Sequence, residues 1–158
     1  MQPSPPRDAH LPRWPERMQH EDRAALPGGQ ARPFVILGAV IALCAVAAGA
    51  FGAHGLRGRA APELLAAFET GARYQMFHAL ALFAIGWWVD RVPSRLVNVA
   101  GWLMVAGTVV FSGSLYAMTL TGARWLGAVT PAGGVLLLLG WACFALAALR
   151  TRTGPRPD

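Results

Sequence analysis

The sequence predicts an all-α, multi-pass membrane protein, an up-down bundle of four transmembrane helices. Its 158 residues are 54% hydrophobic and only 14% charged, and its apolar residues gather into long stretches at residues 34–53, 74–89, 96–120 and 125–149. A helix needs roughly 20 mostly apolar residues to cross the hydrocarbon core of a bilayer. The first, third and fourth stretches meet that length, whereas the second is short.

The segment before the first span, residues 1–32, contains six prolines among mixed charges and has no apolar periodicity. We therefore expect a disordered, Pro-rich cytoplasmic tail, with translation from Met18 as an open alternative. The first apolar run exceeds the roughly 7–15 residues of a signal peptide, so it is expected to stay in the membrane. Residues 33–150 form the expected transmembrane domain, and residues 151–158 a short basic cytoplasmic tail.

The connection between the first two spans predicts a short amphipathic helix at the membrane interface. Pro62 suits a first helical turn, and Leu64, Leu65 and Phe68 fall on one face. Continuation of this helix through Gly71 would lengthen the short second span. The other connections, residues 90–95 and 121–124, are short enough to join antiparallel neighbours.

Small residues predict where the helices approach one another. They recur at Gly38, Ala42, Ala45, Gly49 and Gly52 in the first span, and at Gly101, Gly107, Gly113, Gly127, Gly134 and Gly140 in the last two. Small side chains allow close packing of membrane helices. Trp102 and Trp141 lie deep in their spans and are expected to pack there.

The positive charge of the chain comes from 14 arginines and no lysine, which is typical of a GC-rich bacterial genome. These arginines lie near the span ends, so the membrane surface is the expected counterion and no nucleic-acid partner is predicted. Seven lie on the side of the termini (Arg23, Arg32, Arg91, Arg95, Arg150, Arg152, Arg156) and four on the other (Arg57, Arg59, Arg73, Arg124). This asymmetry predicts that both termini are cytoplasmic.

Polar side chains are expected to cluster at the opposite, outer-leaflet end of the bundle. If the spans alternate in direction, His54 lies at that edge and His78 about 6 Å deeper. The candidate cluster comprises His54, Tyr74, Gln75, His78, Ser112, Ser114, Tyr116 and Thr130. The other half of the bundle is almost entirely aliphatic apart from Asn98.

Several interpretations of this cluster are open from the residues alone. Its members could be hydrogen-bonded pins between helices, with a hydroxyl such as Thr130 or Ser112 pairing a carbonyl left free by Pro131, or they could bind a small molecule, lipid headgroup or ion. Two imidazoles could ligate haem or a metal. Because 24 residues separate His54 from His78 and no further ligand has helical spacing, no metal and no cofactor are predicted.

Catalysis and disulfides have weaker support. Ser112 or Ser114 with His78 has no buried acid to complete a triad, so no enzyme is predicted. Cys44 and Cys143 lie inside apolar spans and offer no disulfide framework.

Four motifs in this order resemble a known family. They are GAFGAHGL (residues 49–56), TGxxYQxxHAL (70–80), FSGSLY (111–116) and TPxGG (130–134). They resemble the domain-of-unknown-function 423 family, also called uncharacterised protein family 0382, to which the transmembrane protein 256 group belongs. The resemblance covers residues 34–149. It implies a four-span protein, in bacteria usually of the inner membrane, and implies no activity.

The expected role is therefore that of a small structural or accessory membrane protein. It would act through helix contacts with a second copy or with a larger membrane complex. The alternative is a small-molecule or ion binding or transport protein that uses the polar cluster. Transport would need a path through the aliphatic half, where Asn98 is the lone polar side chain that the sequence offers.

Overall fold

The computed structural model describes residues 29–150. Within them the chain forms four long α-helices, Ala31–Phe51 (α2), Pro62–Arg91 (α3), Arg95–Thr121 (α4) and Thr130–Arg150 (α5). A π-helical turn, Gly52–Leu56 (η1), extends α2, and a 3-10 helix, Arg124–Ala128 (η2), precedes α5. The predicted all-α class is confirmed. The N-terminal tail was expected to cover residues 1–32, but α2 already begins at Ala31, so its predicted end was wrong. Residues 1–28 of that tail and the tail expected at residues 151–158 lie outside the described residues.

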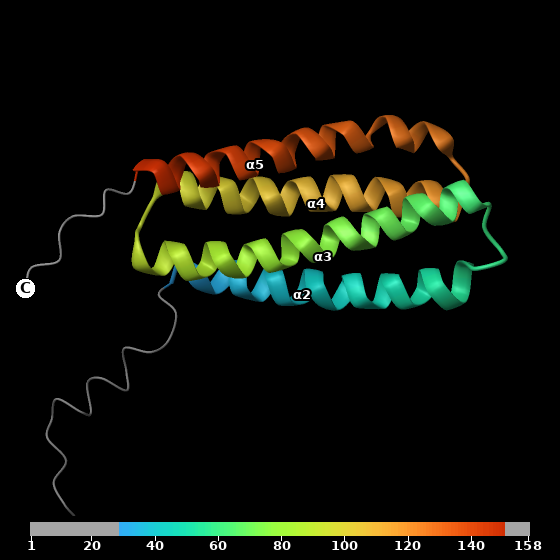
Figure 1. Cartoon of the computed structure of the whole chain (residues 1–158), viewed down its shortest axis with the longest axis horizontal. Coiled ribbons are helices and arrows are strands. Elements are labelled where there is room, and N and C mark those ends of the chain that lie inside the picture. Colours follow the sequence, from blue (N-terminus) through green and yellow to red (C-terminus); the bar gives the residue numbers. More distant parts are fainter. Residues whose placement is uncertain (1–28, 151–158) are drawn as a thin grey trace, which may run out of the picture.

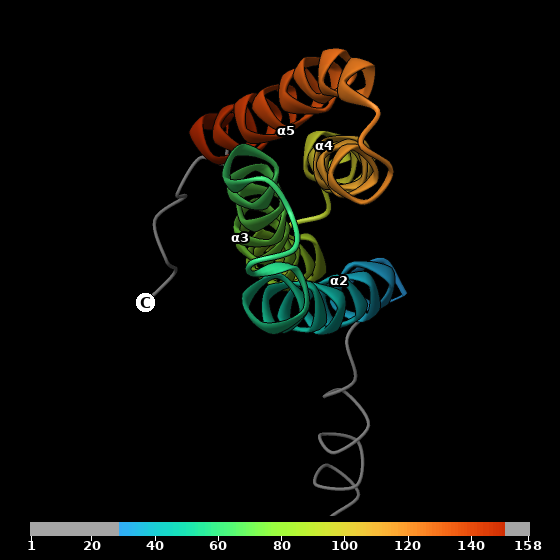
Figure 2. The same cartoon turned by 90° about the vertical axis from the view of Figure 1, so that its right-hand side faces the viewer.

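Consecutive helices run antiparallel, and their connections alternate between the two ends of the bundle (Figure 1). We call the end where α2 begins and α5 finishes the terminal end, and the end that carries η1 and η2 the loop end. Helices α3 and α4 form the central pair; α2 packs mainly on α3, and α5 mainly on α4. Seen along the bundle, α2 and α5 lie on opposite sides of this pair (Figure 2).

Helix α3 is one continuous element of 30 residues. The predicted amphipathic helix is therefore not separate: its residues form the first turns of α3, the continuation that the sequence allowed. Pro62 begins the helix, where its missing N–H costs no hydrogen bond. Gly71 continues the helix in a buried position, where an added Cβ would lie only 2.9 Å from the Tyr116 ring.

The terminal half of the bundle holds an apolar core. Phe34, Leu82, Ile85, Val97 and Met104 are at most 1% exposed and form its centre. Phe34 of α2 reaches across to α4, where Gly101 makes room for it: a Cβ at that position would lie 2.3 Å from the phenylalanine ring. Large side chains thus fill the spaces that glycines leave between the helices.

The predicted close packing of small residues is confirmed at many positions and wrong at two. An added Cβ would meet a neighbouring helix within about 3 Å at Gly38, Gly101, Gly107 and Gly140. By contrast, a Cβ at Gly49 or Gly113 would meet nothing within 4 Å, because these glycines face outward. Their spacing matches that of the contact glycines, but the surfaces of α2 and α4 are only partly covered.

Three helical stretches of the described chain are long and apolar enough to cross a membrane, namely Ala31–Leu56, Arg95–Thr121 and Arg124–Arg150. Helix α3 has sufficient length, but Glu63, Glu69 and Arg73 lie in its first half. Its apolar part, from Tyr74 onward, is packed between α2 and α4 in the middle of the bundle.

Candidate functional site

Gln75 joins three helices. Its side-chain amide donates to the Ile41 carbonyl of α2 at 2.9 Å, and its oxygen accepts from the Tyr116 hydroxyl of α4 at 2.8 Å. The residue is only 7% exposed. An amide in this position has to be paired, since a bilayer core offers no water as a substitute. The two bonds therefore fix the spacing of α2, α3 and α4.

Hydroxyls of α4 reach carbonyls of α3 at two further levels. Ser112 donates to the Gly71 carbonyl at 2.8 Å, and Thr119 lies 2.9 Å from the carbonyls of Leu64 and Leu115. Both hydroxyl residues are buried. The absence of a side chain at Gly71 lets α4 come close enough for the Ser112 bond. These contacts lie along one face of α4, toward the loop end.

His78 connects α3 to α5. The indole N–H of Trp141 donates to His78 Nε2 at 3.1 Å, while His78 Nδ1 lies 2.8 Å from the Tyr74 carbonyl. Because an indole N–H only donates and a carbonyl only accepts, these contacts assign the proton to Nδ1. The imidazole is neutral in this arrangement, and both of its nitrogens are engaged. A metal or haem iron would have to displace the Trp141 bond to reach Nε2.

Ser114 and Thr130 connect α4 to α5. Their hydroxyl oxygens are 2.8 Å apart, and Ser114 also donates to the Phe111 carbonyl at 2.9 Å. Each hydroxyl has a single proton, so Thr130 is the donor between the two. Pro131 is the second residue of α5, where it disrupts no helical hydrogen bond. The prediction that Pro131 frees a carbonyl for Thr130 or Ser112 was therefore wrong.

His54 does not belong with the other members of the predicted cluster. It is exposed in η1 at the loop end, and its neighbour Gly52 lies beside Phe68. His78 is ten residues farther along α3 than Phe68, which is roughly 15 Å at 1.5 Å per residue. The predicted 6 Å difference in depth was wrong because α3 begins at Pro62, well before the apolar stretch.

Tyr74 lies on the outer side of the cluster and is 42% exposed. The centre of its ring lies 4.9 Å from the ring centre of Phe111 and 6.2 Å from that of His78. Its main-chain carbonyl accepts the hydrogen bond from His78 Nδ1. Tyr74, His78, Phe111 and Trp141 line a shallow cavity of about 330 Å³ over α3, α4 and α5. Through this cavity, part of the cluster is open to a ligand.

The predicted cluster is thus a series of separate links between helices. They extend from the loop end to about the middle of the bundle. Two participants were missed by sequence reasoning: Thr119, and Trp141, which was expected only to pack. Thr119 could have been found, since it lies on the same face of α4 as Ser112, seven residues away. Trp141 gave no comparable signal.

The described residues include no group of three or more His, Cys, Asp or Glu side chains placed to hold a metal ion. The chemistry of the cluster is that of neutral donors and acceptors: hydroxyls, one amide, one indole and one neutral imidazole. Such groups can pair helices or hold an uncharged polar ligand.

Comparison with known proteins places this chain in a family. A family model described as "Protein of unknown function (DUF423)" matches residues 48–134. The chain belongs to the DUF423 family. The matched region contains every member of the predicted cluster, whereas Ile41 and Trp141, which complete two of the links, lie outside it.

Curated DUF423 relatives are similar over most of their length. The chain is 48% identical to the UPF0382 membrane protein YwdK of Bacillus subtilis over 118 residues, which cover 74% of this chain and 96% of that protein. A UPF0382 membrane protein of Staphylococcus epidermidis is 49% identical over 117 residues, 74% of this chain and 95% of its own. One from Staphylococcus saprophyticus is 50% identical over 108 residues, 68% and 89% of the two chains. No solved structure matches.

These relatives and the apolar helices identify this DUF423 protein as a membrane protein. The description of the family names no biochemical role.

Proposed function

We propose that this DUF423 protein is a small accessory protein of the bacterial inner membrane that crosses the bilayer four times. Its polar side chains serve to fasten its own helices, and its outer faces contact a second copy or a larger membrane complex. The observation that carries this proposal is the pairing of Gln75, Ser112, His78 and Thr130 with partners on neighbouring helices.

Four crossings are supported by the position of α3. Ala79, Leu82 and Ile85 in its second half are fully buried between the neighbouring helices. A helix packed in this way cannot lie along the membrane surface while its neighbours cross. About 17 residues separate Arg73 from Asp90, which spans roughly 25 Å and approaches the thickness of a hydrocarbon core. The first turns of α3, with Glu63 and Glu69 exposed, would then lie at the interface.

The orientation is inferred from the positions of the arginines in the sequence, seven on the side of the termini against four on the other side. Positive residues are retained on the cytoplasmic side, so both termini are assigned to the cytoplasm. The hydrogen-bonded half of the bundle then lies in the outer leaflet.

An accessory role is supported by the lipid-facing surfaces of α2 and α5. Leu43 and Val46 of α2 and Leu138 and Leu149 of α5 are each more than 60% exposed. In a bilayer such faces contact lipid or another helix, and an outward glycine such as Gly49 of α2 would allow close approach of a partner.

A second candidate function is binding of a small lipid-soluble molecule, and the cavity at Tyr74 and Trp141 favours it. Its walls combine aromatic rings with Leu137 and Leu138, and Tyr74, which carries a hydroxyl, is partly exposed. Transport has less support because the terminal half of the bundle has an apolar core. The hydrogen bond from the Asn98 amide to the Gln30 side chain, at 3.1 Å, lies where α2 and α4 begin and not along a path through the core.

Native mass spectrometry of the full chain, purified in mild detergent, tests the accessory role. We expect a mass that contains a second copy or a partner subunit, with phospholipid as its only stoichiometric small ligand. A monomer that carries a different small molecule in stoichiometric amount, lost in Trp141→Ala, would favour the binding function instead. A monomer without any such molecule would also contradict the accessory role.

A further inference from the structure

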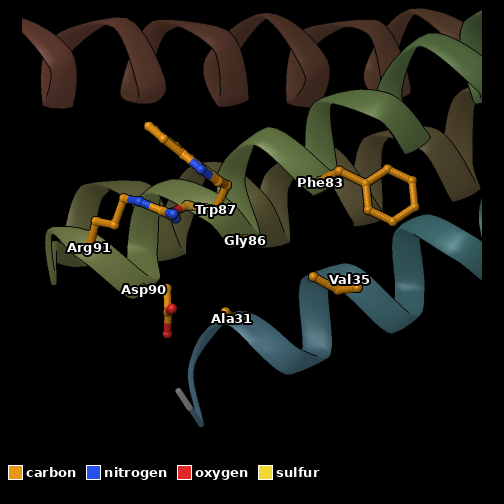
Figure 3. A pocket seen from close by; sticks show the side chains of 7 residues that line it. All are labelled: Ala31, Val35, Phe83, Gly86, Trp87, Asp90 and Arg91. Atoms are coloured by element: carbon orange, nitrogen blue, oxygen red, sulfur yellow. The ribbon is translucent and has the colours of Figure 1, made fainter. Parts of the chain in front are cut away.

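A second cavity lies far from the hydrogen-bonded cluster, at the terminal end of the bundle between the start of α2 and the end of α3 (Figure 3). Its volume is about 280 Å³. Val35, Phe83 and Gly86 form its apolar part, and Trp87, Asp90 and Arg91 form its polar mouth. We propose that this cavity binds the headgroup of a phospholipid that carries a primary amine, such as phosphatidylethanolamine.

The apolar part of the cavity depends on Gly86. A Cβ at this position would lie 3.0 Å from Val35 Cγ2 and 3.4 Å from the Ala31 carbonyl, so a larger residue would crowd the cavity. Val35 and Phe83 are partly exposed, so the apolar walls of the cavity reach the surface of α2 and α3. A headgroup in the mouth could therefore keep its acyl chains in the bilayer while their first carbons lie against these side chains.

Arg91 provides the site for the phosphate. Its guanidinium lies 4.1 Å from the centre of the Trp87 ring, and Nη1 donates to the Trp87 carbonyl at 2.9 Å. These two contacts hold the side chain at the mouth. A guanidinium has five N–H donors in a planar fork that matches phosphate oxygens, so one bond to a carbonyl leaves several for a phosphodiester.

Asp90 determines which phospholipid fits. In Figure 3 its carboxyl group points toward the start of α2, on the other side of the mouth from the Arg91 guanidinium. Asp90 already makes an interaction in the structure; a carboxylate has about four acceptor sites, so it can accept an ammonium donor in addition. A headgroup with only negative charge would be attracted by Arg91 and repelled by Asp90. A headgroup with both charges satisfies both residues.

The amine of that headgroup is assigned as primary because of its hydrogen bonds. A primary ammonium donates three, as a lysine side chain does, whereas a quaternary ammonium has no N–H to donate. The mouth also lies at the right depth: Trp87 is an exposed indole near the helix end, and Arg91 is the last residue of α3. The proposal requires insertion in a membrane and is independent of the accessory role.

The test uses full-length protein reconstituted in nanodiscs that contain equal amounts of phosphatidylethanolamine, phosphatidylcholine and phosphatidylglycerol. Lipid that remains bound after release from the disc is identified by native mass spectrometry. For the wild type we expect roughly fivefold enrichment of phosphatidylethanolamine over both other lipids. Equal retention of the three lipids, or enrichment of phosphatidylglycerol, would overturn the proposal.

Variants assign the effect to the cavity. Arg91→Gln should reduce retention of all three lipids, and Asp90→Asn should remove the preference over phosphatidylglycerol. Val35→Phe, which fills the apolar part, should lower retention without changing any charge. Arg150→Gln, at the same end of the bundle but on α5, is the matched control and should behave as the wild type. If the preference survives in Asp90→Asn and Val35→Phe alike, the lipid binds elsewhere and the proposal is wrong.

Discussion

Five buried polar side chains are each paired with a group on a neighbouring helix, namely Gln75, His78, Ser112, Ser114 and Thr119. By contrast, Thr108 bonds within α4, and the buried indole N–H of Trp88 has no hydrogen-bond partner among the described residues. An unpaired polar group in hydrocarbon costs several kcal/mol, whereas a hydrogen bond between membrane helices adds only about 0.6 kcal/mol on average. The bonds of Gln75 and His78 therefore contribute less to overall stability than to the choice of which helix faces pair. Each hydrogen bond of this network is therefore expected to have a measurable but modest effect on the free energy of unfolding.

Replacement of Trp141 by Phe removes the N–H that His78 Nε2 accepts. We expect Trp141→Phe to lower the free energy of unfolding by about 0.5–1.5 kcal/mol, measured by thermal or denaturant unfolding in detergent. Trp102→Phe is the control, because Trp102 has similar exposure and contacts Phe34 through its ring. Equal effects of the two substitutions would show that the His78 bond contributes nothing.

The two tyrosines distinguish fasteners from ligand groups. Tyr116→Phe leaves the buried Gln75 oxygen without this donor and should cost about 1 kcal/mol, whereas Tyr74→Phe removes an outward hydroxyl and should be close to neutral. Melting temperatures of the two variants in the same detergent provide the comparison. A Tyr74→Phe protein that is as stable as the wild type but loses a cellular phenotype would instead support the binding function.

At the scale of the helices, α4 and α5 meet through glycines. A Cβ added to Gly133 would lie 2.4 Å from the main-chain nitrogen of Phe111, closer than any side chain can approach. The contact brings Thr130 within hydrogen-bonding distance of Ser114, so backbone packing and polar pairing depend on each other.

Gly133→Ala should consequently separate α4 from α5 and lower the melting temperature by several degrees. Gly113→Ala places the same methyl group on the outward side of α4, where nothing lies within 4 Å, and should be neutral or slightly stabilising because alanine favours a helix. The two variants can be compared by thermal unfolding and by size-exclusion profile. A larger loss of stability in Gly113→Ala would mean that this face is covered in the native protein.

Sequence patterns predicted the helices well and their ends less well. Apolar length located α2, α4 and α5, because a membrane span is a property of the local composition. The start of α3 depends on Pro62 and on packing of Phe68 against Gly52, and the misplacement of His54 followed from that start. The hydrogen bonds of Trp141 and Thr119 depend on how each helix is rotated about its own axis. That rotation is determined by contacts between helices and cannot be read from the sequence of one helix.

The whole molecule divides into two halves along its axis. The half at the terminal end is packed with large apolar side chains around Met104 and Phe34, and the half at the loop end is held by hydrogen bonds. Helices α3 and α4 carry both halves, while α2 and α5 present their outer faces to the surroundings (Figure 2).

The orientation of this assembly is open to a reporter experiment. A reporter that is active only in the cytoplasm, fused after Asp158, should give signal, because the arginine asymmetry predicts cytoplasmic termini. A periplasm-active reporter at the same position should give none. The reverse pattern would overturn the assigned orientation and leave the helix contacts unchanged.

A four-span bundle requires that α3 crosses the membrane. This helix is the least apolar of the four, because it contains Glu63, Glu69 and Arg73, so its crossing is the point to test. Single cysteines placed at Ala61 and Val92, just outside the two ends of α3, in a protein with Cys44 and Cys143 replaced by alanine, test this with a membrane-impermeant thiol reagent. Four crossings predict that the two positions are labelled from opposite sides of the membrane, Ala61→Cys from outside intact cells and Val92→Cys only after the membrane is opened. Labelling of both positions from the same side would contradict the four-span bundle.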